Sequence, residues 1–157
     1  MEIERITHLG LCVTDLERSM RFYCDLFGFE EVGRLELAGA ALDKLNGMEG
    51  VEVTSVFMER DGWRLELIAF DAPASPTPEG PTAMNRPGLT HFAFRVKDLE
   101  AVCAAIEAAG GGILGETKID TGPGRGAIMV HDPDGQRIEL LEAPGDPNAL
   151  PMGAARD

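Results

Sequence analysis

Two histidines and two glutamates stand at matched places in the two halves of this chain, and together they could bind a metal ion. His8 lies in ITHLGLCVTDLE, and His91 lies 83 positions later in the related segment LTHFAFRVKDLE. Glu66 lies in GWRLELIAF, and Glu139 lies 73 positions later in GQRIELLEA. Two imidazoles and two carboxylates suit Zn²⁺, Ni²⁺, Mn²⁺, Co²⁺ or Fe²⁺ and leave positions open for water or substrate.

The recurrence of these residues argues against four unrelated side chains. Taken singly, a strand histidine is usually structural and a strand glutamate is usually solvated. Independent residues of that kind have no reason to recur at equivalent positions of two repeats. We therefore predict that His8, Glu66, His91 and Glu139 act together and bind one divalent metal ion.

The glutamates stand on predicted strands in which the neighbouring residues are apolar. Leu65 and Leu67 point to one face of their strand, so Glu66 points to the other. Glu139 is flanked in the same way by Ile138 and Leu140. Each carboxylate is therefore expected on the face opposite the apolar core, where a curled sheet can hold a ligand.

Each half contains the same order of predicted elements, and such an internal repeat decides the architecture. A strand carries the histidine, a helix follows Asp15 or Asp98 as N-cap and ends near Gly28 or Gly110, and three strands follow. The predicted strands are 6–13, 29–37, 51–59 and 63–70 in the first half, and 89–96, about 112–116, 127–131 and 136–143 in the second. The first half carries about ten additional residues, which we place in Ala38–Gly50.

These elements predict an α+β fold of two pseudosymmetric βαβββ modules, whose curled mixed sheets surround a central metal cleft. We expect one domain over residues 1–157, because this length suits a single domain. The Pro-rich stretch DAPASPTPEGP has the composition of a linker. The predicted parts are module 1 at about 4–70, the linker at about 71–86, module 2 at about 88–143 and a C-terminal tail at about 144–157.

Composition excludes several classes of function. The formal net charge of −13 argues against binding to nucleic acid or to an anionic membrane, because both need a basic surface. No apolar run is long enough to span a bilayer, and no signal peptide is recognised. The three cysteines form no CxxC pair and are odd in number, which favours a reducing compartment. We expect a cytoplasmic protein.

The motifs ITHLGLCVTDLERSMRFYCDLFGFEEV, RLELIAF, LTHFAFRVKDLEAV and DPDGQRIELLE resemble the vicinal oxygen chelate superfamily, which contains glyoxalases, bleomycin-resistance proteins and extradiol dioxygenases. The resemblance implies paired βαβββ modules around a divalent metal, with His8, Glu66, His91 and Glu139 as its ligands. It further implies a homodimer that acts on a small molecule.

The ligand set is most similar to that of glyoxalase I, which implies a lyase or isomerase that transfers a proton by way of a metal-stabilised enediolate. The resemblance makes Glu139 the better candidate for a ligand that is also the base, with Glu66 as its pseudosymmetric partner. Glyoxalase I also places an arginine after the first helix to hold the glutathione carboxylate. Arg34 falls one position away from it, so we expect Arg34 on the opposite face of its strand.

Three alternatives remain open from the sequence. A methylmalonyl-CoA epimerase-like isomerase would need a further carboxylate, for which Glu49 or Glu52 is available, and His131 and the glycines of residues 122–126 resemble features of that family. An extradiol dioxygenase would use Fe²⁺ and a tyrosine near it, but the single tyrosine, Tyr23, is expected in the core. An antibiotic-binding protein is the non-enzymatic alternative, and retention of all four ligands argues against it.

Overall fold

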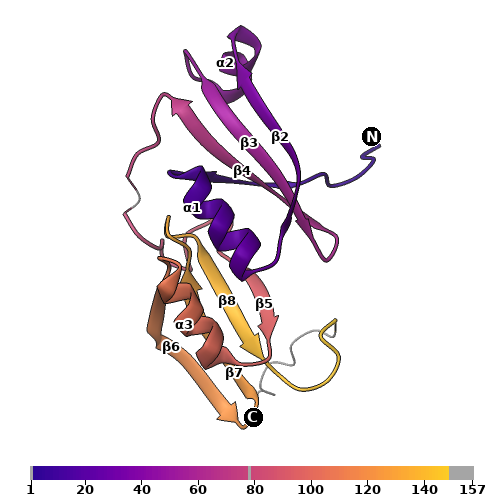
Figure 1. The fold of residues 1–157 in the computed structure, drawn as a ribbon, viewed down its shortest axis with the longest axis vertical. Helices are drawn as coiled ribbons and strands as arrows, with labels where there is room; N and C mark the ends of the chain where they lie inside the picture. The colour runs from indigo at the N-terminus through magenta and orange to yellow at the C-terminus, as the bar shows by residue number, and fades with distance from the viewer. Residues whose placement is uncertain (1, 78, 149–157) are drawn as a thin grey trace. The chain divides into compact units, whose positions relative to one another are not determined.

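The computed structural model describes residues 2–77 and 79–148 of the chain. The chain divides into two compact units, Met1–Pro78 and Glu79–Asp157, and the boundary falls inside the predicted linker. Each unit holds a four-stranded mixed sheet, so the predicted pair of βαβββ modules is confirmed (Figure 1). The part of the predicted tail beyond Asn148 lies outside the described residues.

Module 1 orders its sheet β1-β4-β3-β2, with β1 parallel to β4 and the other neighbours antiparallel. Its first helix continues α1 into a π-helical segment, η1, and a second helix, α2, stands between β2 and β3. The elements are β1 (Leu9–Val13), α1 (Leu16–Met20), η1 (Arg21–Leu26), β2 (Glu30–Ala38), α2 (Ala40–Asn46), β3 (Glu52–Arg60) and β4 (Trp63–Ala72).

The first helix begins and ends where its sequence predicts. The Asp15 carboxylate accepts a hydrogen bond from the backbone N–H of Arg18 at 2.9 Å, which satisfies one of the free amides of the first turn. Gly28 ends the helix with φ of 67°, a conformation that favours glycine. Between these caps, Phe22 and Tyr23 are buried and join the core of module 1.

The additional residues of the first half form α2, a helix that the sequence patterns did not predict. Gly47 follows it in the left-handed conformation, with φ of 66°. The helix has only seven residues and none of them is buried, so it lacks the extended apolar periodicity that predicts a helix packed on the core. The location of the insertion within Ala38–Gly50 is confirmed.

The two faces of the module 1 sheet differ in character. Leu65 pairs with Met58 and Leu67 with Val56, and all four side chains are buried on what we call the helix face. Glu66 alternates with these leucines and therefore points to the opposite side, which we call the glutamate face.

Module 2 repeats this plan with the sheet order β5-β8-β7-β6, and β5 is parallel to β8. Figure 1 shows α3 lying across one side of this sheet, where it contacts β6, β7 and β8. The elements are β5 (Phe92–Val96), α3 (Leu99–Ala108), β6 (Gly112–Gly122), β7 (Arg125–His131) and β8 (Arg137–Glu142). Strand β6 extends well beyond the five residues predicted for it.

The core of module 2 lies between its sheet and α3. Ile128, Val130, Ile138 and Leu140 are buried on the helix face, so Glu139 again points to the glutamate face. The Asp98 carboxylate caps α3 by accepting from the N–H of Ala101 at 2.9 Å. None of the helices within residues 2–77 and 79–148 is long and apolar enough to cross a membrane.

The turn before β8 is organised by a buried carboxylate. Asp132 is fully buried, and its Oδ1 atom accepts hydrogen bonds from the backbone N–H groups of Asp134 and Gln136, at 2.9 and 2.8 Å. The DPDG segment therefore closes a tight turn directly before the strand that carries Glu139.

Candidate metal centre

Module 1 brings His8 and Glu66 together on the glutamate face. Strand β1 pairs Gly10 with Glu66, and His8 lies two residues before Gly10, so alternation directs the imidazole to the side of the carboxylate. His8 Nε2 lies 3.1 Å from Glu66 Oε2. The Phe57 ring stands edge-on to the imidazole with centroids 5.4 Å apart, and Phe57 is also the β3 partner of Glu66.

Module 2 makes the equivalent pair. Ala93 pairs with Glu139 across the parallel strands β5 and β8, and His91 lies two residues before Ala93. His91 Nε2 lies 3.3 Å from Glu139 Oε2. Both side chains are 27% exposed, so the carboxylate is accessible from solvent without being fully hydrated.

The geometry of each pair fits ligands of a divalent ion. Two ligand atoms held about 2.1 Å from one metal, at octahedral or tetrahedral angles, are separated by about 3.0 to 3.4 Å. The observed N···O distances of 3.1 and 3.3 Å lie in this range. The same distances suit an N–H···O hydrogen bond, so the geometry of each pair does not require a metal. Histidine nitrogen and carboxylate oxygen are donors that zinc and neighbouring transition metals accept.

Comparison with known proteins identifies the family of this chain. Residues 5–140 match the Glyoxalase family, described as the Glyoxalase/Bleomycin resistance protein/Dioxygenase superfamily. The chain belongs to this superfamily. The resemblance stated from the sequence is therefore confirmed.

The chain is also similar to a relative from Vibrio and shares its fold with solved structures. A probable lactoylglutathione lyase of Vibrio parahaemolyticus is 32% identical over 142 residues, which cover 88% of this chain and 90% of the relative. A glyoxalase family protein from Bacillus cereus shares the fold with a TM-score of 0.75 at 19% identity, covering 90% of this chain and 95% of that one. The fosfomycin resistance protein FosX of Listeria monocytogenes, solved with Mn(II) and sulfate, has a TM-score of 0.56 at 18% identity, covering 91% and 95%.

Each histidine–glutamate pair is formed by two residues of the same module. Among residues 2–77 and 79–148, no group of three or more His, Cys, Asp or Glu side chains is arranged to hold a metal ion. A single ion shared by both pairs therefore stays a prediction.

Two kinds of residue near the pairs were not found by sequence reasoning. Thr7 Oγ1 lies 3.0 Å from Nδ1 of His8, and Thr90 Oγ1 lies 3.0 Å from Nδ1 of His91. The signal was present, since a threonine precedes the histidine in both repeats. Phe57 carried no such signal, because only strand pairing reveals its place beside His8.

Arg34 lies on the helix face of module 1, as expected from its sequence position. It pairs with Val56 on β3, whereas Glu66 is the neighbour of Phe57 on the other face. The guanidinium contacts the carboxylates of Glu31 at 3.2 Å and Glu17 at 3.7 Å. The hydrogen bond to Glu31 raises the pKa of Arg34 above its ordinary value, so the side chain stays charged. Arg34 is therefore engaged away from the His8–Glu66 pair.

The residues considered for alternative chemistries occupy other places. Tyr23 is fully buried in the module 1 core, as predicted. His131 packs against Gly112 and leaves no room for a Cβ atom there, and its Nδ1 lies 2.8 Å from the carbonyl oxygen of Asp132. Glu49 is exposed in the turn before β3. Glu52 begins β3, five residues from Phe57, which is about 16 Å along a strand.

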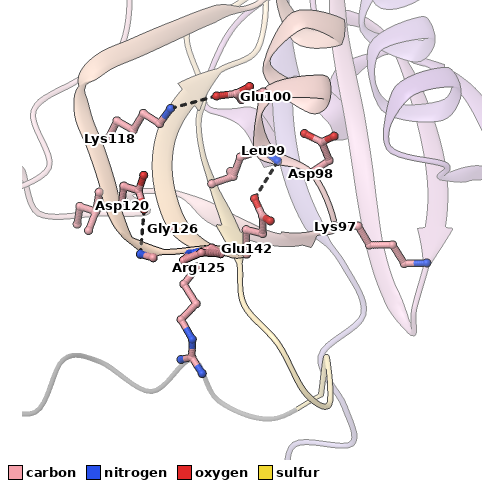
Figure 2. A pocket seen from close by; sticks show the side chains of 13 residues that line it. Lys97, Asp98, Leu99, Glu100, Lys118, Asp120, Arg125, Gly126 and Glu142 are labelled. Atoms are coloured by element: carbon pink, nitrogen blue, oxygen red, sulfur yellow. Dashed lines mark hydrogen bonds and ion pairs between the residues drawn. The ribbon is translucent and has the colours of Figure 1, made fainter.

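A pocket of about 550 Å³ lies in module 2, beside the N-terminus of α3 and the β6–β7 hairpin that contains Gly122, Gly124 and Gly126. Figure 2 shows the Glu142 carboxylate reaching the backbone N–H of Leu99, at 3.2 Å. Glu142 pairs with Gly126 and shares the helix face with Leu140, so this pocket lies on the side of the sheet opposite Glu139.

Proposed function

We propose that the chain is a divalent-metal-dependent lyase or isomerase that moves a proton next to a carbonyl or thioester group of a small molecule. The observation that carries the proposal is the pairing of histidine nitrogen with glutamate oxygen at ligand spacing in both modules. His8, Glu66, His91 and Glu139 are the residues that would hold the metal, with one ion serving both pairs.

The division of labour follows from the chemistry of these groups. A divalent ion supplies, when bound, positive charge beside the substrate oxygens on which negative charge develops. The Glu139 carboxylate accepts the proton from the substrate carbon and returns it to the neighbouring carbon or to the same one. Its side chain is more exposed than that of Glu66, 27% against 14%, which supports Glu139 as the group that meets substrate.

The relative named as a probable lactoylglutathione lyase supports a glyoxalase-like reaction. A specific observation also favours the second candidate, an epimerase-like isomerase of a thioester. Because Arg34 is bound to carboxylates on the helix face, it is not available to bind a glutathione carboxylate on the glutamate face. In the epimerase reading the second base remains Glu49 or Glu52, although Glu52 stands far along β3 from the pair.

Metal content and turnover test the proposal. The purified protein is stripped, reconstituted with Zn²⁺, Ni²⁺, Co²⁺, Mn²⁺ or Fe²⁺, and analysed for bound metal, and one ion per chain is expected. Activity is then measured on the hemithioacetal of methylglyoxal and glutathione, and on a methylmalonyl thioester in D₂O. Turnover of the first supports the lyase, and deuterium incorporation into the second supports the epimerase.

Several results would contradict the proposal. Activity with Fe²⁺ alone and consumption of O₂ on a catechol would favour the dioxygenase. Failure to bind any of these metals after reconstitution would favour the antibiotic-binding alternative.

We also propose a homodimer, because symmetric pairs are the most common soluble oligomers. Light scattering that gives the mass of one chain would contradict that part.

A further inference from the structure

Thr7 and Thr90 make the same contact in the two modules. Each hydroxyl oxygen lies 3.0 Å from Nδ1 of the histidine that follows it, while Nε2 of that histidine faces a glutamate. The third histidine of the chain differs, because His131 follows a valine and its Nδ1 contacts a backbone carbonyl. The hydroxyl contact therefore accompanies the two histidines of the His–Glu pairs.

The contact matters because a neutral imidazole carries only one N–H. An ionised carboxylate only accepts hydrogen bonds, so the 3.3 Å contact between a neutral His91 and an ionised Glu139 is a hydrogen bond only in the tautomer that carries the proton on Nε2. Nδ1 is then an acceptor, and the Thr90 hydroxyl donates to it. When Nε2 binds a cation through its lone pair, the proton must stand on Nδ1, and the hydroxyl must accept.

A hydroxyl group can either donate or accept a hydrogen bond, whereas a carbonyl or an ionised carboxylate can only accept one. Resting on the proposed function, we propose that Thr7 and Thr90 are positioning residues that keep Nδ1 hydrogen-bonded in both tautomers. Each histidine can then exchange its hydrogen bond to glutamate for a bond to a divalent ion without rotating its ring. The proton that leaves Nε2 for water is balanced by one that joins Nδ1 from water.

The valine and serine variants of Thr90 separate this role from a packing role. Thr90→Val keeps the shape of the side chain and removes the hydroxyl, whereas Thr90→Ser keeps the hydroxyl. Loss of a group that orients a ligand histidine typically weakens metal binding about 10-fold to 100-fold. We expect Thr90→Val to weaken Zn²⁺ and Co²⁺ binding at least about 10-fold, and Thr90→Ser to stay within about threefold of wild type.

The control variant is Thr121→Val. The Thr121 hydroxyl bonds to the carbonyl oxygen of Arg125 on an exposed part of module 2, so this substitution removes a hydroxyl without touching a histidine. Its metal affinity should equal that of wild type. Thr7→Val and Thr7→Ser repeat the comparison in module 1.

Nitrogen-15 NMR of the imidazoles reads the tautomer directly. In metal-free protein we expect the His91 proton on Nε2, and in the zinc complex we expect it on Nδ1. The imidazole N–H proton should exchange slowly with water in wild type and Thr90→Ser, and rapidly in Thr90→Val. Equal affinity of the valine variant, no rescue by serine, or an Nδ1 proton in metal-free protein would each overturn the inference alone. Absence of metal binding by wild type would overturn the proposed function as well.

Discussion

Replacing Glu139 by glutamine tests the metal centre most directly. The substitution keeps the shape of the side chain and removes its negative charge, 3.3 Å from Nε2 of His91. The site is partly exposed, so the protein should tolerate an amide there without misfolding. Turnover should be abolished, because a glutamine amide does not accept a proton from carbon at neutral pH.

The effect on metal affinity can be estimated from the place of Glu139 in the pair. Losing a group that only orients a ligand costs about 10-fold to 100-fold in affinity. Glu139 is expected to bind the metal itself, so its loss should reach at least the upper end of that range. A 100-fold loss corresponds to about 2.7 kcal/mol of binding free energy.

A competition titration with a chromophoric chelator measures this loss, and Glu142→Gln is the matched control. Glu142 stands on the same strand but on the helix face, where its carboxylate accepts from the N–H of Leu99. Its replacement should leave metal affinity within about twofold, because it does not touch the glutamate face. Full metal occupancy and turnover in Glu139→Gln, or equal losses in the two variants, would refute the assignment.

Two further predictions concern packing and thiol reactivity. Gly126→Ala should lower the free energy of unfolding, measured in urea, by about 1–3 kcal/mol, because a Cβ atom would stand 2.8 Å from the carbonyl oxygen of Ile119. Gly115→Ala is the control, because Gly115 has open space around it, and it should lower the free energy of unfolding by less than half as much. Iodoacetamide should alkylate the exposed Cys12 first. Burial raises the pKa of Cys24 and of Cys103, so a smaller fraction of these thiols is ionised at a given pH. Their alkylation should therefore require a higher pH than alkylation of free N-acetylcysteine. Equal alkylation rates of these cysteines and N-acetylcysteine at neutral pH would contradict this.

Much of the fold followed from the internal repeat. Asp15 and Asp98 cap their helices as predicted, and period-two alternation placed Glu66 and Glu139 opposite their apolar neighbours. The same alternation placed Arg34 on the helix face, since a shift of one residue moves a strand side chain to the other side. These features are predictable because each depends on local periodicity or on a single cap.

Other features depend on interactions that sequence periodicity does not encode. Helix α2 lies in an insertion with no counterpart in the second half, and it buries none of its residues. Strand β6 runs on to Gly122 because it pairs with β7 across two irregularities in register. The edge-on contact of Phe57 with His8 arises only when β1, β4 and β3 lie side by side.

The parallel pairing of β1 with β4, and of β5 with β8, means that metal binding depends on the order in which the strands fold. In each module the strand next to the histidine comes first and the glutamate strand comes last, so the two predicted ligands meet only when the intervening chain has closed into a loop. Such distant contacts form slowly, because loop-closure entropy opposes them until the strands pair. A module whose last strand is missing or unpaired therefore does not bring its histidine and glutamate together, and we expect it to bind no metal ion there. Metal uptake during refolding should report completion of the last strand, well after the local hairpins have formed.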